Sequence, residues 1–158
     1  MPTIRAVASA IIDAPPAVVY GLLADYHEGH PSVLPQAYFG RIFVDEGGTG
    51  AGTRFRVETR QPTGIRTLAM EVTEPEPGRV LCETEIGGPL VTHFTVDPVD
   101  GGRRAKTTIE TEWTRGGVQG LLESVISPPL FRHVFRAELR QLNEVASRKA
   151  SEASTPAP

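Results

Sequence analysis

The 158-residue chain contains a single cysteine, Cys82, so no disulfide can form within it. A chain of this kind is compatible with a reducing compartment, and we predict a cytoplasmic location. Cys82 lies in a strand-like run, where a buried structural thiol is more common than a reactive one.

An excess of charge of one sign is also missing. The chain has 16 Lys and Arg against 19 Asp and Glu, for a net charge of −3, and no block of like charge. Nucleic-acid-binding proteins normally carry a basic stripe. We therefore expect no nucleic-acid partner, and the charge pattern implies no electrostatic partner.

Long hydrophobic runs are absent as well, since no stretch approaches the ~20 apolar residues of a membrane span. The apolar run Ala6–Ile12 follows Arg5 and so imitates a signal peptide. It is too short for one and is closed by Asp13 and two prolines. We predict that Ile4–Ile12 forms a first β-strand instead.

The length predicts a single domain, because domains usually have roughly 100–200 residues. We place this domain at residues 1–148. Residues 151–158 are small, polar, charged or proline and can bury little surface, which predicts a disordered tail over 149–158. The sequence does not predict the oligomeric state.

The middle of the chain alternates polar and apolar residues between turn signals. Before it, Asp13 is a candidate N-cap and Pro15-Pro16 suit the first turn of a helix; a second short helix is expected around Ser32–Gln36. The alternation, with one charged face and one apolar face, predicts an antiparallel sheet with one wet side. The expected strands are Tyr38–Asp45, Thr53–Arg60, Ile65–Glu74, Val80–Ile86, Leu90–Val96 and Ala105–Trp113.

A long helix is predicted over Val118–Val145, where apolar residues recur at helical spacing. A lone long helix after such a sheet must cover its apolar face. Ser127-Pro128-Pro129 interrupts the pattern, and proline removes a backbone donor, so we expect a kink or a short break there.

Several motifs carry a family resemblance: Ile11–Tyr20 (IIDAPPAVVY), Leu22–Tyr26 (LLADY), the segment 30–35 (HPSVLP), Asp100–Gly102 and Thr107–Thr111. With the order of elements, the sequence resembles the START-like (SRPBCC) superfamily. That superfamily includes the birch-pollen-allergen (Bet v 1-like) type and the bacterial polyketide cyclase/dehydrase-like proteins.

This resemblance covers Ile4 to about Ser147 and implies an α+β helix-grip fold. A seven-stranded curved antiparallel sheet would surround a long C-terminal helix, with two short helices between strands 1 and 2. The superfamily holds lipid carriers, cyclases, hormone receptors and co-chaperone domains, so the fold alone does not fix a function.

The resemblance also implies an elongated cavity between sheet and helix, whereas the residues alone favour a solid core. Leu23 and Tyr26 would close one end of the cavity. From strand parity, the expected ligand-binding residues are Tyr26, Phe55, Val57, Leu68, Met70, Val72, Phe94, Val96, Ile109, Thr111, Trp113, Phe131, Val134 and Phe135.

The function expected from this lining is binding of a hydrophobic small molecule, lipid-like or polycyclic and polyketide-like, by a carrier or sensor. The alternative is a polyketide cyclase or dehydratase that uses the same cavity. An enzyme needs an inward-facing ionisable group, for which His93, Tyr26 and Asp25 are weak candidates. A third hypothesis is partner binding through the outer face of the sheet. It is disfavoured because the residues expected on that face are charged, whereas a docking surface would show an exposed apolar patch. No cofactor is expected.

The other polar residues favour structural roles. His27, Glu28 and His30 lack the His-Glu-x-x-His spacing, so we expect a solvated loop near the pocket mouth and no metal site. His93 has the parity opposite Phe94 and is expected outside, unless a bulge turns it inward as a general base.

The strand carboxylates are expected to form cross-strand pairs with arginines on the wet face. These residues are Glu71, Glu83, Glu85, Glu110 and Glu112, with Arg54, Arg56, Arg60 and Arg66. The loop Gly47–Gly52 lacks the Gly-Lys-Ser/Thr ending of a phosphate loop and joins two strands, so a hairpin loop gating the pocket is expected.

Overall fold

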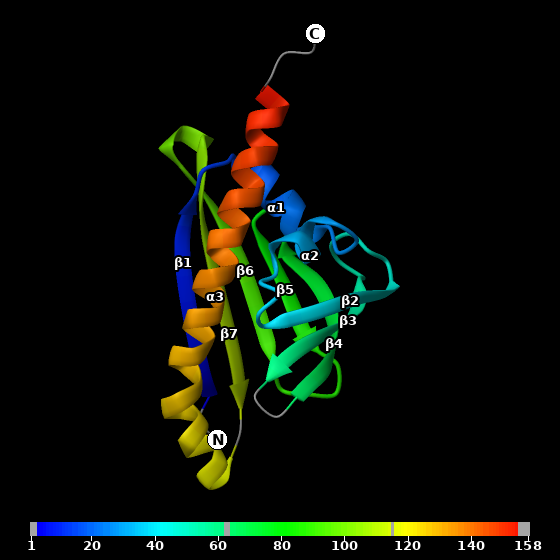
Figure 1. Ribbon diagram of the computed structural model, residues 1–158, viewed down its shortest axis with the longest axis vertical. Coiled ribbons are helices and arrows are strands. Elements are labelled where there is room, and N and C mark those ends of the chain that lie inside the picture. Colours follow the sequence, from blue (N-terminus) through cyan, green and yellow to red (C-terminus); the bar gives the residue numbers. More distant parts are fainter. Residues whose placement is uncertain (1–2, 62–63, 115, 155–158) are drawn as a thin grey trace.

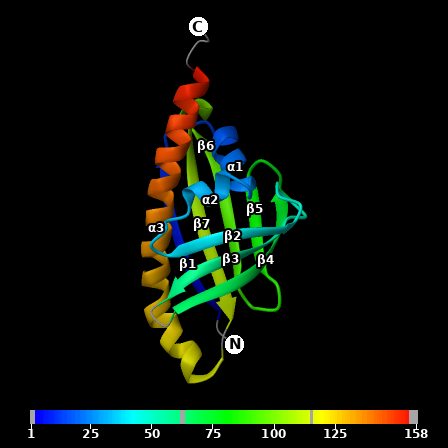
Figure 2. The same cartoon turned by 45° about the vertical axis from the view of Figure 1, so that its right-hand side comes forward.

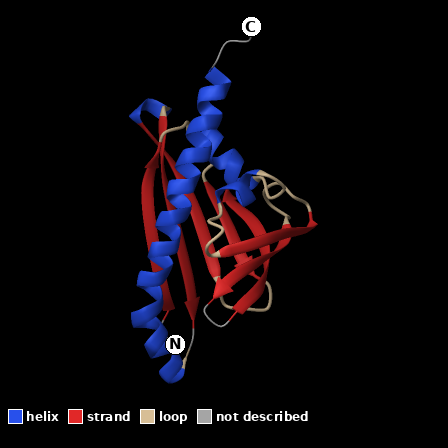
Figure 3. Cartoon of the chain, viewed as in Figure 1, coloured by secondary structure: helices blue, strands red, loops and turns tan. Residues whose placement is uncertain are grey.

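The computed structural model describes residues 3–61, 64–114 and 116–154, and for residues 117–126 and 154 it describes the backbone only. The described residues fold into one curved sheet and three α-helices (Figures 1 and 3). The elements are β1 (Thr3–Ile12), α1 (Pro16–Ala24), α2 (Gly29–Val33), β2 (Phe39–Glu46), β3 (Arg54–Gln61), β4 (Gly64–Glu76), β5 (Val80–Glu85), β6 (Val91–Val99), a 3-10 turn at Asp100–Gly102, β7 (Arg104–Thr114) and α3 (Gly117–Ser154).

The seven strands are antiparallel, in the order β1-β7-β6-β5-β4-β3-β2. The helix α3 lies along one face of the sheet and packs chiefly on β1 (Figure 1). The start of β2 lies beside α3 in both views, so the two ends of the sheet curl toward the same helix (Figure 2). The predicted α+β helix-grip fold is therefore confirmed.

The start of α1 differs from the prediction. The N-cap position is Pro15, without a side-chain cap, and the N–H groups of Val18 and Val19 bond to the Pro15 carbonyl. Asp13 does not cap the helix. Its backbone N–H donates to Asn143 Oδ1 at 2.8 Å, which ties the start of α1 to α3.

The second helix also lies earlier than expected, at Gly29–Val33 instead of Ser32–Gln36. The reason is a close approach to α1, because a Cβ on Gly29 would lie 2.5 Å from the carbonyl oxygen of Leu22. Only glycine permits this approach, so α2 starts at Gly29 and folds back against α1.

The helix α3 is longer than predicted and has no break. Its backbone stays helical through Pro128 and Pro129, because the φ of proline is compatible with a helix although its N–H is missing. It also continues to Ser154. Residues 149–154, which the sequence places in the tail, are therefore helical; they include the strong helix formers Lys149, Ala150 and Ala153.

The hydrophobic core lies between the inner face of the sheet and the three helices. Its largest buried apolar side chains include Ile12, Leu23, Leu81, Leu139 and Leu142. The helix α2 is fixed to α3 as well, because the Gln141 amide donates to the carbonyl oxygens of Ser32 and Leu34. None of the described helices is long and apolar enough to cross a membrane.

Candidate functional site

Six apolar side chains of the sheet and of α3 are only half buried. They belong to β2, β4 and α3: Phe39, Ile42, Val44, Leu68, Phe131 and Val134. All of them except Val134 pack against the hydrophobic core. We call this half-buried set the apolar mouth.

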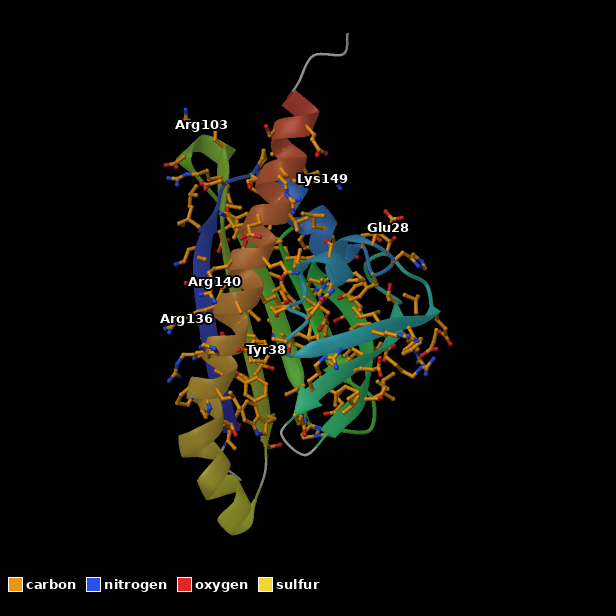
Figure 4. The ribbon with its side chains drawn as sticks, in the orientation of Figure 1. Glu28, Tyr38, Arg103, Arg136, Arg140 and Lys149 are labelled. Atoms are coloured by element: carbon orange, nitrogen blue, oxygen red, sulfur yellow. The ribbon has the colours of Figure 1, made fainter. Side chains whose placement is uncertain are left out.

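Aromatic rings form one wall of the apolar mouth. The ring of Phe131 lies 4.9 Å from that of Trp113 and 5.8 Å from that of Phe135. Tyr38 lies on the side of α3 that faces β2, edge-on to His133 at 6.1 Å. Arg136 and Arg140 project from the other side of α3 (Figure 4). The apolar face of α3 is thus turned to the interior and its charged face to the outside.

A polar band crosses the inner face of the sheet beyond this wall. The strand register places Val72, Glu83, Thr92, Thr111 and Ala6 in one transverse row. The hydroxyl groups of Thr92 and Thr111 are buried and lie 2.6 Å apart. An apolar row of Leu81, Phe94, Ile109 and Ala8 flanks the band. Three polar side chains in a sheet's inner row are unusual, since buried strand faces are mostly apolar.

Glu83 is the centre of a buried hydrogen-bonded group. Its Oε1 accepts a hydrogen bond of 2.6 Å from the Tyr26 hydroxyl and lies 3.5 Å from His30 Nε2. Tyr26 is 1% exposed, His30 3% and Glu83 8%. Burial, followed by the charge of Glu83 and its hydrogen bond, raises the pKa of Tyr26 well above its ordinary value. Tyr26 therefore remains a neutral hydrogen-bond donor.

His30 is held by both of its ring nitrogens. Nδ1 lies 2.8 Å from the carbonyl oxygen of Leu23, and a carbonyl can only accept, so we assign the proton to Nδ1. This leaves Nε2 facing the Glu83 carboxyl group. The Tyr26 ring is stacked between His30, at 4.7 Å, and Phe55, at 4.6 Å, which fixes the plane of the phenol.

A fourth ionisable group, Glu138, enters from α3. It lies three and four residues after Phe135 and Val134, so it shares their helix face one turn further on. Glu138 is 3% exposed, and its Oε1 has no hydrogen-bond partner. Burial, with a smaller contribution from the charge of Glu83, raises the pKa of Glu138 to about 8. The group is therefore mostly protonated at neutral pH.

Tyr26, His30, Glu83 and Glu138 together are called the buried polar cluster below. Backbone contacts set the position of Tyr26 within it. The Tyr26 N–H donates to the Gly48 carbonyl, and the Gly50 N–H donates to the carbonyl of Ala24. The glycine-rich loop, expected to gate the pocket, is thus bonded to the end of α1.

Asp25, a weak catalytic candidate from the sequence, has a structural role here. Its carboxylate accepts the backbone N–H groups of His27, Glu28 and Gly29 at 3.1–3.3 Å. Although partial burial opposes the shift, these bonds lower the pKa of Asp25 below its ordinary value. The charged carboxylate thereby holds the turn that brings His30 under Tyr26.

Two expectations about the cluster are wrong. Glu83 does not pair on the wet face, because it has the same parity as Leu81, which lies opposite Phe94 on the inner face. His30 does not lie in a solvated loop, because α2 buries it against α1; His27 and Glu28 are exposed as expected. Other carboxylates do pair with arginine, as Arg54–Glu71 at 3.6 Å and Arg66–Glu85 at 3.3 Å show.

His93 lies opposite Cys82 and Glu110, on the face of the sheet away from Phe94. It takes no part in the buried polar cluster. Of the weak catalytic candidates, only Tyr26 belongs to that cluster. The predicted lining residues Tyr26, Phe55, Val57, Met70, Val72, Phe94, Val96, Ile109 and Phe135 share the hydrophobic core, and Leu68 and Phe131 pack against it. Thr111 and Trp113 are buried, and Val134 is half buried.

The described surface also has two grooves away from the cluster. One, of about 570 Å³, has Phe39, Arg41, Phe43, Glu58, Arg60 and Ile65 in its lining; the other, of about 450 Å³, lies between β1 and the charged side of α3. Among the described residues, no group of three or more His, Cys, Asp or Glu side chains could hold a metal ion.

Solved structures with this fold include proteins of different kinds. KanY, solved by NMR, is 28% identical with a TM-score of 0.78, over 92% of this chain and 99% of its own. The Zhui aromatase/cyclase from Streptomyces sp. R1128 is 17% identical with a TM-score of 0.71, over 98% and 100%. Ara h 8.0201 is 11% identical with a TM-score of 0.59, over 89% and 98%.

No curated protein sequence matches the chain significantly. The family profile described as "Polyketide cyclase / dehydrase and lipid transport" matches residues 3–147, which is nearly the whole described domain. With the helix-grip topology, this match shows that the chain belongs to the polyketide cyclase/dehydrase and lipid transport family.

Proposed function

We propose that the protein binds a hydrophobic small molecule, lipid-like or polycyclic, in the interior between the sheet and α3. The observation that carries this proposal is the continuity of the apolar mouth with the buried polar cluster. Half-buried Phe131 and Val134 lie on the helix face that leads to Glu138, whose Oε1 has no partner. A pocket of apolar walls with a few convergent polar groups is typical of small-molecule sites.

The ligand's apolar part would lie against the aromatic wall, and its polar end would reach the cluster. The half burial of the apolar mouth supports this, because side chains in a solid core are closely packed and shielded from solvent. The family description names lipid transport, which agrees with an apolar ligand. The role would be that of a carrier or sensor.

A pair of tryptophan variants on α3 tests the location. Val134→Trp fills the interior, whereas Leu130→Trp adds the same ring at a position that is 56% exposed. We expect Val134→Trp to weaken the binding of an uncharged naphthylamine probe at least tenfold and Leu130→Trp to leave it unchanged. Equal binding by both variants, each folded by circular dichroism, would place the site elsewhere. Native mass spectrometry of the protein as expressed would identify a retained ligand.

A second candidate function, a cyclase or dehydratase acting on a polyketide-like substrate, is favoured by the buried polar cluster itself. Such chemistry needs a base to remove a proton next to a carbonyl and an acid to protonate the hydroxyl that leaves as water. Glu83 with His30 would supply the base, and protonated Glu138 would supply the acid. Buried groups with strongly shifted pKa values are frequent at catalytic sites.

Turnover separates the two functions. If the protein is an enzyme, Glu138→Gln lowers the rate of water loss from a β-hydroxyketone test substrate by about 10²-fold or more, while binding of the substrate persists. If the protein is a carrier, the native protein leaves the same compound unchanged, as followed by absorbance of the conjugated product.

A further inference from the structure

The polar groups that face the interior are almost all used. Tyr26 donates to Glu83, Thr92 pairs with Thr111, and His30 Nδ1 bonds to a backbone carbonyl. Among the described residues, the buried side-chain oxygens without a partner are Glu138 Oε1 and the hydroxyl oxygen of Thr107. A buried polar atom without a partner costs stability, so a group that supplies the missing bond is bound favourably.

Glu138 is placed to meet a ligand that enters from the apolar mouth. It follows Phe131, Val134 and Phe135 on one face of α3, so an elongated molecule lying along that face ends at its carboxyl group. Across from it, Glu83 carries the carboxyl group of the sheet's polar band. The end of the interior therefore combines one carboxyl group that has an unpartnered oxygen with a second carboxyl group nearby.

We infer that this interior selects ligands with a neutral hydrogen-bonding end, a hydroxyl or a carbonyl, and discriminates against ligands that end in a carboxylate. The inference rests on the proposed function, because it names the ligand class of the same site. A ligand hydroxyl group can donate a hydrogen bond to Glu138 Oε1, and a ligand carbonyl group can accept one from the protonated carboxyl group. Neither group brings a charge into the interior. A carboxylate must lose its water shell beside the Glu83 carboxyl group, with no arginine or lysine among the described members of the cluster.

Protonation of Glu138 adds a second signature. Among the described titratable groups, Glu83 from β5 acts on Glu138 by its charge, and Tyr26, which follows α1, and His30 from α2 contact Glu83. As pH rises through about 8, Glu138 gains a negative charge in the buried interior. This charge repels an anionic ligand further, and Glu138→Gln removes the effect.

The experiment compares two ligands of equal chain length, decanol and decanoate, by displacement of the uncharged naphthylamine probe at pH 7 and pH 9. For the native protein we expect decanol to bind at least tenfold more tightly than decanoate at pH 7. The affinity for decanoate should fall several-fold more by pH 9, and this further fall should be absent in Glu138→Gln. Glu138→Leu should weaken the binding of decanol about tenfold, which corresponds to the loss of one hydrogen bond. The exposed control Glu144→Leu should change neither ligand.

Two outcomes would overturn the inference in a protein that still binds the probe. One is equal affinity of the native protein for decanoate and decanol, and the other is an affinity for decanol that Glu138→Leu leaves unchanged. Absence of probe binding to the native protein would instead refute the proposed function. Glu138→Leu replaces a buried carboxyl group with an apolar side chain of similar size, so the variant is expected to fold.

Discussion

Replacing Glu138 by glutamine should change how the stability of the protein depends on pH. In the native protein, burial raises the pKa of this carboxyl group to about 8, from 4.5 in an exposed chain. Between these values the folded state holds a proton that the unfolded state has released. Stability therefore falls as pH rises from about 5 to 8 and returns on acidification. Glutamine has nearly the same shape as glutamate but does not titrate.

The size of the effect follows from the two pKa values. Each unit of difference between the two pKa values corresponds to about 1.4 kcal/mol. Ionising Glu138 in the folded state therefore lowers the free energy of unfolding by at most about 5 kcal/mol. From pH 5 to pH 8, the stability of Glu138→Gln relative to the native protein should rise by about 3 to 4 kcal/mol. Near pH 5 the two proteins should differ little.

Urea unfolding at pH 5, 6, 7 and 8, followed by far-ultraviolet circular dichroism, measures this difference directly. Subtracting the two proteins cancels every other titrating group that the substitution leaves in place. Glu144→Gln, an exposed change on the same helix, should give a flat difference over the same range. A difference for Glu138→Gln that stays constant within about 0.5 kcal/mol would show that Glu138 is ionised in the folded protein and would refute the reasoning.

Three further predictions concern other polar side chains. Tyr26→Phe leaves a buried carboxyl oxygen without its donor and should cost about 1–3 kcal/mol by urea unfolding at pH 7, more than Tyr20→Phe, whose hydroxyl is only partly buried. Thr107→Val removes an unpartnered buried hydroxyl and should stabilise by up to about 1 kcal/mol, whereas Thr111→Val breaks the buried threonine pair and should destabilise by about 1–2 kcal/mol. Asp25→Ala should cost about 1–2 kcal/mol at pH 7. Because the pKa of Asp25 is lowered in the folded protein, this cost should become smaller as pH falls below the ordinary pKa of the group. Thermal unfolding at pH 7 and pH 3 measures the change, and an equal cost at both pH values would show that the carboxylate plays no part.

The order of elements and most inner faces could be predicted from the sequence because the alternation is clean in four strands. Phe55 and Val57 in β3 and Phe94 and Val96 in β6 face the core as their parity predicts. The strand β5 is different, since Val80, Leu81 and Cys82 are apolar on both faces. Its orientation is set by pairing with β4 and β6, which a single strand's pattern does not contain.

Of the buried polar cluster, only Tyr26 is among the residues that the sequence predicts for the interior. Glu138 stands among apolar residues at helical spacing, between Phe135 and Leu142, and this signal was present in the sequence. His30 carried no such signal. It is buried because Gly29 lets α2 approach the backbone of α1, a tertiary contact that local pattern does not encode.

The energetic balance of the cluster argues that it serves a ligand. Two carboxyl groups, an imidazole and a phenol occupy an interior that apolar side chains of similar volume could fill, often with a gain in stability. One carboxyl oxygen is left without a partner, so the arrangement is incomplete as a purely structural network. A bound polar group completes it. Tyr26, whose ring is stacked on both faces, and Asp25, which fixes the turn, hold the other members in place before any ligand arrives. The proposed binding and the alternative catalysis would both use this preorganised end of the interior. They differ in the fate of the Glu138 proton, which stays on the carboxyl group in a carrier and leaves with the substrate's hydroxyl group in an enzyme. Measuring both ligand affinity and turnover for Glu138→Gln distinguishes the two.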